Sequence, residues 1–130
     1  MRFVVTGGAG FVGSHLVRLL LENNHEVIVV DNLHTGKKEN IESVIDKIEF
    51  QKIDIRNHES MKNILKNIDG VFHQAALTVV QDSFSNPKEY HDVNVQGTEN
   101  IFSLSIENKF KVVYASSSSV YGHKQKMPIK

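Results

Sequence analysis

The chain has 130 residues, enough for one domain with its own hydrophobic core. Fifteen basic and fifteen acidic side chains cancel, which leaves no electrostatic footprint for nucleic acid or for an anionic membrane. Cysteine is absent from the sequence, so disulfides and thiolate metal sites are excluded, and the apolar runs are far shorter than a membrane span. We therefore expect a soluble cytoplasmic protein.

The first 31 residues follow the order strand, glycine turn, helix, strand and acid. An apolar run over residues 2–6 leads into three glycines with the spacing G-x-G-x-x-G, and Gly7, Gly10 and Gly13 also fit G-x-x-G-x-x-G. A helical pattern, a second apolar run and Asp31 follow. Glycines between a strand and a helix, with an acid ending the next strand, predict a dinucleotide-binding site.

Each residue type in this pattern has a chemical reason. The missing Cβ of Gly10 lets the backbone approach a pyrophosphate, and that of Gly13 lets the helix lie close to the sheet. Free N–H groups at the start of the helix, near Phe11, face the phosphates. The carboxylate of Asp31 can accept hydrogen bonds from ribose hydroxyls and would repel a 2′-phosphate. The pattern therefore predicts NAD rather than NADP.

The remaining elements alternate between helices and strands. Helices are predicted over residues 11–23, over 39–45, after Asn57 as N-cap up to Asp69-Gly70, and over 87–108. Strands are predicted over residues 26–30, 48–53, 71–76 and 110–115, and the serine-rich segment 116–122 follows the last of them. Strands that alternate with helices predict a parallel sheet with right-handed crossovers.

The fold class that we predict is α/β, a Rossmann-type doubly wound parallel sheet with strand order 3-2-1-4-5 in a single NAD-binding domain over residues 1–130. Ligands of such a sheet bind beyond the carboxyl ends of its strands. Five strand ends then converge on one crevice, and they carry Gly7 to Val12, Asp31-Asn32, Asp54-Ile55, Ala75 to Thr78, and Ser117.

Six short motifs along the chain extend this pattern. They are TGGAGFVGSH from Thr6, DNL from Asp31, DIR from Asp54, HQAAL from His73, NVQGT from Asn94 and SSSSVYG from Ser116. Together they resemble the NAD-dependent epimerase/dehydratase family of extended short-chain dehydrogenases over essentially the whole chain. Within that family, they are most similar to the enzymes that epimerise UDP-hexoses and UDP-hexuronates.

The resemblance implies a set of cofactor contacts. The N–H groups of Phe11 and Val12 would face the pyrophosphate, Asp31 would hold the adenosine ribose, and Asp54 would flank the adenine. Residues 74–78 would line the nicotinamide side, braced by Asn94. The full cofactor set is Gly7, Gly10, Phe11, Val12, Gly13, Asp31, Asn32, Leu33, His34, Thr35, Gly36, Asp54, Ile55, Gln74, Ala75, Ala76, Leu77, Thr78 and Asn94.

The resemblance also implies the chemistry. Ser117 matches the catalytic Ser/Thr that hydrogen-bonds the reacting sugar hydroxyl, and Thr78 and Ser118 join it as substrate contacts. In the implied reaction, C4 of a UDP-hexose gives a hydride to tightly held NAD. The resulting 4-keto sugar turns over and takes the hydride back on its other face. The implied partner is a UDP-sugar, with a homodimer as the full-length form.

The family's Tyr-x-x-x-Lys pair belongs beyond Gly122, and this chain does not contain it, because Gln125 stands four residues after Tyr121. The last strands and the small substrate domain are also expected to be absent. We therefore expect the N-terminal portion of an epimerase that is inactive alone. The alternatives are a UDP-glucuronate 4-epimerase, another nucleotide-sugar epimerase or dehydratase, and a non-catalytic NAD-binding module.

Two further interpretations are disfavoured by the residues. A 4,6-dehydratase of the resembled family carries Asp and Glu where this chain has Ser118 and Ser119, and serines cannot supply that acid and base. The seven histidines show no H-x-x-x-H spacing, so we predict no metal site.

Overall fold

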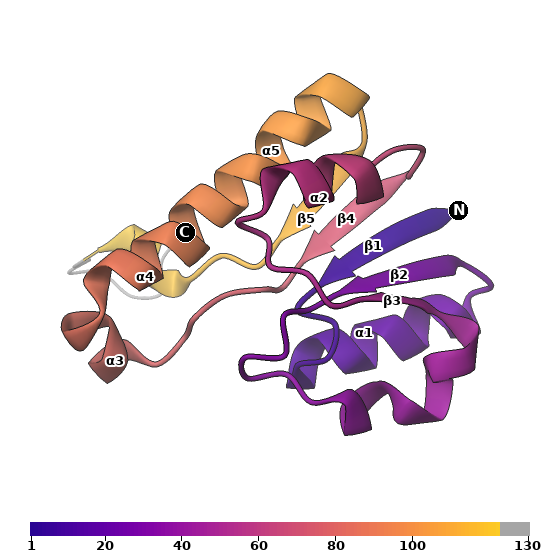
Figure 1. Cartoon of the computed structure of the whole chain (residues 1–130), viewed down its shortest axis with the longest axis horizontal. Coiled ribbons are helices and arrows are strands. Elements are labelled where there is room, and N and C mark those ends of the chain that lie inside the picture. The colour runs from indigo at the N-terminus through magenta and orange to yellow at the C-terminus, as the bar shows by residue number, and fades with distance from the viewer. Residues whose placement is uncertain (123–130) are drawn as a thin grey trace.

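A computed structural model describes residues 1–122 as a five-stranded parallel sheet with helices on both faces (Figure 1). The strand order is β3-β2-β1-β4-β5, as predicted. The strands are β1 (Arg2–Thr6), β2 (Glu26–Val30), β3 (Glu49–Gln51), β4 (Gly70–His73) and β5 (Lys111–Tyr114).

The helices divide between the two faces of the sheet. Figure 1 shows α1 on one face, with α2 and α5 on the other. The α-helices are α1 (Phe11–Glu22), α2 (His58–Ile64), α3 (Val80–Ser85), α4 (Pro87–His91) and α5 (Gly97–Asn108). Two 3₁₀ helices, η1 (Lys38–Lys47) and η3 (Ser118–Tyr121), and one π-helical turn, η2 (Asp92–Gln96), complete the described chain.

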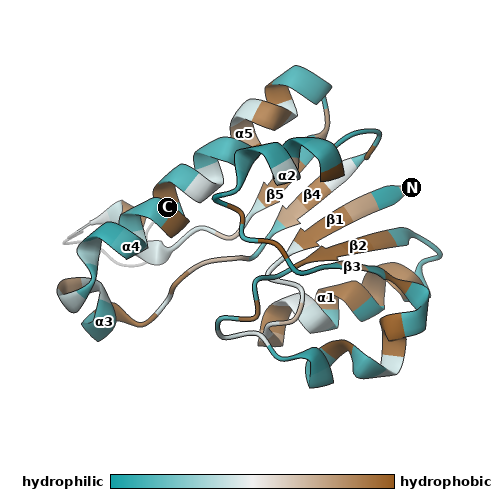
Figure 2. Cartoon of the chain, in the orientation of Figure 1, coloured by the Kyte–Doolittle hydropathy of each residue, from teal (hydrophilic) through white to brown (hydrophobic). Residues whose placement is uncertain are grey.

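The alternation of side chains along each strand builds two separate cores. Val4 and Val71 belong to the core beneath α2 and α5, whereas Val5 and Val29 belong to the core beneath α1 and η1. Figure 2 shows the resulting apolar strands between helices with polar outer faces. Because strands buried on both faces need apolar residues at successive positions, the continuous runs in the sequence correspond to central strands.

Several element boundaries differ from those predicted. α2 ends at Ile64 rather than near Asp69, since the backbone at the C-cap Leu65 already leaves the helical conformation, and Asn67 beyond it has a φ of 56°. The strand predicted over 48–53 keeps only three paired residues. The helix predicted over 87–108 contains the π-helical turn η2, and α3 was not predicted. Asn57 does cap α2, since its side-chain oxygen accepts a hydrogen bond from the Ser60 N–H at 3.0 Å.

Among residues 1–122, the helices are all too short or too polar to cross a membrane. The carboxyl ends of the central strands lie side by side. The Gly7 N–H donates to the Val30 carbonyl at 2.8 Å, and the Gln74 N–H donates to the Thr6 carbonyl at 3.1 Å. These bonds join the segments that follow β1, β2 and β4 into one edge, where the candidate site lies.

Candidate functional site

The turn after β1 is held by a close approach between two glycines. Gly7 has a φ of +67°, a conformation that favours glycine, and its carbonyl accepts the Gly10 N–H at 3.0 Å. A Cβ on Gly13 would lie 2.1 Å from the same carbonyl oxygen. Because Gly13 has no side chain, the first turn of α1 can pack directly on the backbone of Gly7 and Gly8.

This approach leaves the amino end of α1 open to a ligand. The N-cap residue, Gly10, has no side chain that could satisfy the first N–H groups of the helix. The Ser14 N–H is the first to bond back, to the Gly10 carbonyl at 3.0 Å. The preceding N–H groups, on Phe11, Val12 and Gly13, lie at the positive end of the helix, which favours an anion.

The carboxylate of Asp31 ties the end of β2 to the glycine turn. One oxygen accepts the Ala9 N–H at 3.0 Å, and the other accepts the Leu33 N–H at 2.8 Å. Asp31 is only 7% exposed, and a Cβ on Gly36 would come within 2.8 Å of both carboxylate oxygens. The acid predicted to contact a ligand thus also positions the turn that would hold that ligand.

A second anchor holds the same turn from the other side. The Ala9 carbonyl accepts the Lys37 N–H at 3.0 Å and the Asn40 side-chain amide at 2.8 Å. The Arg18 guanidinium in turn donates to the Asn40 carbonyl. Asn40 was not predicted as a site residue, because it lies in a polar stretch whose position relative to the glycines depends on the folded chain.

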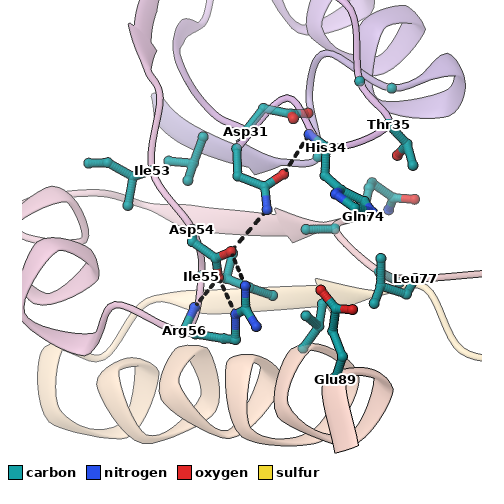
Figure 3. A pocket seen from close by; sticks show the side chains of 18 residues that line it. Asp31, His34, Thr35, Ile53, Asp54, Ile55, Arg56, Gln74, Leu77 and Glu89 are labelled. Carbon is teal, nitrogen blue, oxygen red and sulfur yellow. Dashed lines mark hydrogen bonds and ion pairs between the residues drawn. The ribbon is translucent and has the colours of Figure 1, made fainter. Parts of the chain in front are cut away.

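The first of two cavities at this edge opens beside Asp31 and is bordered by charged residues (Figure 3). Asp54 accepts four hydrogen bonds there, one from Asn32 at 2.9 Å and three from the Arg56 backbone and guanidinium at 2.8–2.9 Å. Figure 3 shows Glu89, from α4, pointing toward this cavity on the side of Arg56.

Asp54 and Arg56 each stabilise the charged form of the other. The hydrogen bond from the Arg56 guanidinium holds the pKa of the Asp54 carboxyl well below its ordinary value, against the opposing effect of burial. The same contact raises the pKa of Arg56. Arg56 and Glu89 were not predicted, although Arg56 stands in the DIR motif.

The second cavity continues along the edge toward β5. It shares Gly7, Gly10, Thr35 and the segment 74–77 with the first cavity. Its further lining residues are Phe11, Val12, Gly13, His73, Thr78, Asn94, Thr98, Tyr114, Ala115, Ser116 and Ser117. The shared wall means that the two cavities form one cleft that runs across the carboxyl ends of the sheet.

The segment 74–77 in this shared wall has no regular structure of its own and is held by side chains. The Thr6 hydroxyl oxygen accepts the N–H groups of Gln74 and Ala75 at 3.2 and 3.3 Å. At the other end, Asn94 in η2 accepts the Leu77 N–H and donates to the Leu77 carbonyl, both at 2.9 Å.

A buried histidine joins these two anchors. The Thr98 hydroxyl donates to the Asn94 carbonyl at 2.8 Å, so its oxygen accepts the His73 Nε2–H at 2.9 Å. His73 Nδ1 is then the acceptor of the Thr6 hydroxyl at 2.6 Å. This order assigns the Nε2–H tautomer to a ring that is 1% exposed, and burial lowers the pKa of His73 to about 4.

Nearly all of the predicted site residues lie together in this cleft. Leu33 is an exception, since it lines neither cavity and packs against the core beneath α1, with a φ of 61°. Ser118 lines neither cavity in the described part of the chain, while Ser117 does, with its hydroxyl accepting the Ser119 N–H at 3.2 Å. Gln125, cited for the Tyr-x-x-x-Lys spacing, lies outside the described residues.

Metal-ligating side chains do not cluster in the described chain. Over residues 1–122, we find no group of three His, Asp or Glu side chains that could hold a metal ion. The buried side-chain nitrogen and oxygen atoms of the same residues all have hydrogen-bond partners. The backbone N–H groups at the start of α1 are left without a helical partner, as at any helix amino end.

Comparisons with known proteins place these features in a family context. The model of the NAD dependent epimerase/dehydratase family matches residues 3–130. A putative UDP-glucose 4-epimerase of Methanocaldococcus jannaschii is 46% identical over 97% of the chain. The chain spans only 41% of the length of that relative.

Two solved structures superpose closely on the chain. A UDP-glucose 4-epimerase from Stenotrophomonas maltophila, with bound NAD and formylated UDP-arabinopyranose, has a TM-score of 0.89 at 32% identity and covers 99% of this chain. A dTDP-glucose 4,6-dehydratase from Streptomyces venezuelae, with bound NAD, has a TM-score of 0.88 at 34% identity and covers 97%. The chain covers 40% and 42% of these two structures.

The close contact at Gly13 generates a first prediction. Gly13→Ala should lower the free energy of unfolding by about 1–3 kcal/mol or more, because the new methyl group must displace the Gly7 carbonyl. Urea denaturation measures this change. Gly10→Ala is the matched control, since its Cβ would lie at 3.1 Å from that carbonyl, and an equal loss in both variants would contradict the prediction.

Burial of His73 generates a second prediction. Its pKa in the folded chain is about 4, below its ordinary value of 6.5, so the unfolded chain binds the proton more readily between these values. The contribution of neutral His73 to the free energy of unfolding is fully present above pH 6.5. It should fall by up to about 3 kcal/mol as the pH drops to 4. Urea denaturation at several pH values measures the slope. His73→Asn should flatten it, whereas the exposed-site control His91→Gln should leave it unchanged.

Proposed function

The chain belongs to the NAD-dependent epimerase/dehydratase family, and from this premise we propose that it forms the NAD-binding portion of a nucleotide-sugar 4-epimerase. The observation that carries the proposal is the pairing of Asp31 with the open amino end of α1. A buried carboxylate and a row of free backbone N–H groups, joined through Ala9, suit a ribose next to a pyrophosphate.

The residues present fit NAD along the whole cleft. The bare backbone between Gly7 and Gly13 leaves room for phosphates, and the apolar side chains of Ile53 and Ile55 suit a flat base in the first cavity. Asp31 disfavours a 2′-phosphate by charge repulsion. The small residues Ala75 and Ala76 leave space where the two cavities join.

NAD, when bound, supplies a reversible acceptor for hydride, and the protein contributes position and electrostatics. We assign the nicotinamide side to the second cavity, because Thr78, Asn94 and Ser117 line it. Ser117 would hydrogen-bond the reacting hydroxyl of the sugar, and Thr78 would contact the substrate. Ser118 lines neither cavity among residues 1–122, which weighs against the contact expected for it.

The choice of reaction within the family rests on the serine-rich turn. A dehydratase needs an acid and a base to eliminate water, and Ser118 and Ser119 offer neither at the places expected for them. We therefore propose UDP-hexose 4-epimerisation, with UDP-glucuronate as the alternative substrate. This activity, and a cytoplasmic homodimer as its form, are proposed for the whole protein, since the chain covers only 41% of the Methanocaldococcus jannaschii relative and 40% of the Stenotrophomonas maltophila structure.

NAD binding by the 130-residue chain tests the cofactor assignment. Isothermal titration calorimetry should show saturable binding of NAD and much weaker binding of NADP. Asp31→Ala should weaken NAD binding on the order of ten- to a hundredfold, because it removes a charged acceptor and loosens the Ala9 turn. A folded chain that binds neither nucleotide would contradict the proposal.

A turnover assay tests whether the 130-residue chain is active without the Tyr-x-x-x-Lys pair. The Tyr-x-x-x-Lys pair is missing from the 130-residue sequence, and general acid–base catalysis is commonly worth about 10²–10⁴-fold. We expect negligible conversion of UDP-glucose to UDP-galactose, measured by chromatography beside a complete family epimerase. Rates that match the complete enzyme would show that other residues of this chain do the proton transfer.

A further inference from the structure

We propose that His73 and Thr98 are positioning residues that set the nicotinamide half of the cofactor site, an inference that rests on the proposed NAD-binding function. The relay formed by Thr6, His73, Thr98 and Asn94 connects both ends of the segment 74–77. This segment is the wall that the two cavities share.

The hydrogen bonds of the relay all run in one direction, and each hydroxyl or ring proton has an acceptor. Thr6 accepts the N–H groups of Gln74 and Ala75 and donates its single proton to His73. His73 donates its single ring proton to Thr98, which donates its own to the Asn94 carbonyl. Because every proton in this series has one destination, the loss of one hydroxyl leaves a buried neighbour without its partner.

The side chains of Ala75 and Leu77 both pack against the core beneath α2 and α5, but the backbone is held differently at the two ends of the segment. At Gln74–Ala75 the backbone packs on the glycine turn, since a Cβ on Gly7 would lie 2.8 Å from the Ala75 nitrogen. At Leu77 the backbone N–H and carbonyl both bond to the Asn94 side chain, and the relay ends at the backbone carbonyl of the same Asn94. A broken relay should therefore move the backbone at Leu77 and leave Gln74 and Ala75, which lie against the glycine turn, in place.

This asymmetry separates positioning from general support of the fold. The phosphates and the adenosine ribose would depend on α1 and Asp31, which the relay does not touch. The nicotinamide ring would lie against Leu77, Thr78 and Asn94 in the second cavity. Damage to the relay should thus weaken NAD while leaving ADP-ribose, which lacks the nicotinamide, bound as before.

The experiment compares NAD with ADP-ribose in calorimetric titrations of the 130-residue chain. Thr98→Val removes the hydroxyl with little change of shape, and Thr98→Ser keeps it. We expect Thr98→Val to weaken NAD about tenfold, the effect of one lost hydrogen bond, while the dissociation constant of ADP-ribose stays within about twofold. Thr98→Ser should bind both ligands like the original chain.

His73→Asn breaks the same relay at a second point, because it keeps an acceptor near Nδ1 for Thr6 but loses the donor to Thr98. It should show the same selective loss of NAD affinity, with folding checked by circular dichroism. Equal weakening of both ligands in folded Thr98→Val, or no weakening of either, would overturn the inference.

The same titrations of the unsubstituted chain have two further informative outcomes. Equal affinity for NAD and ADP-ribose would show that the segment does not hold the nicotinamide, and this would also overturn the inference. A folded chain that binds neither ligand would instead remove the proposed function, and the inference with it.

Discussion

The close contact of Gly13 with the Gly7 carbonyl is the constraint on which the rest of the site depends. A side chain at Gly13 would overlap that oxygen, so only the bare backbone lets α1 start directly beyond β1. This placement brings the Ala9 N–H within reach of Asp31, the residue that follows β2. It also aims the free N–H groups of α1 at the cleft. One steric relation thereby sets the positions of a dipole, a carboxylate and a turn.

The buried polar residues at the edge of the sheet serve the fold and the site together. Asp31, Thr6 and His73 are all buried, and each bonds to backbone or side chains of a neighbouring segment. Buried polar groups of this kind are costly unless every partner is present. Their bonds therefore hold the irregular segments after β1, β2 and β4 in one arrangement, which regular secondary structure does not do there.

Sequence patterns were sufficient for the features that depend on local spacing. The glycines and Asp31 are separated by a helix of ordinary length, so their meeting follows from the strand–helix–strand pattern. Asn40 and Glu89 reach the site from a 3₁₀ helix and from α4, and only the folded chain shows what they approach. The role of Thr98 was equally hidden, because it depends on the tautomer of a histidine that the sequence suggests only as structural.

The carboxylate of Asp54 lies in the first cavity but is already engaged by neighbouring side chains. It lines the first cavity, as the family resemblance implies, yet both of its oxygens already accept two hydrogen bonds each. A carboxylate has about four lone-pair sites, so those of Asp54 are occupied by Arg56 and Asn32. Its main effect is then to fix the Arg56 guanidinium at the rim. The carboxylate of Glu89 lines the same cavity and lies on the side of Arg56.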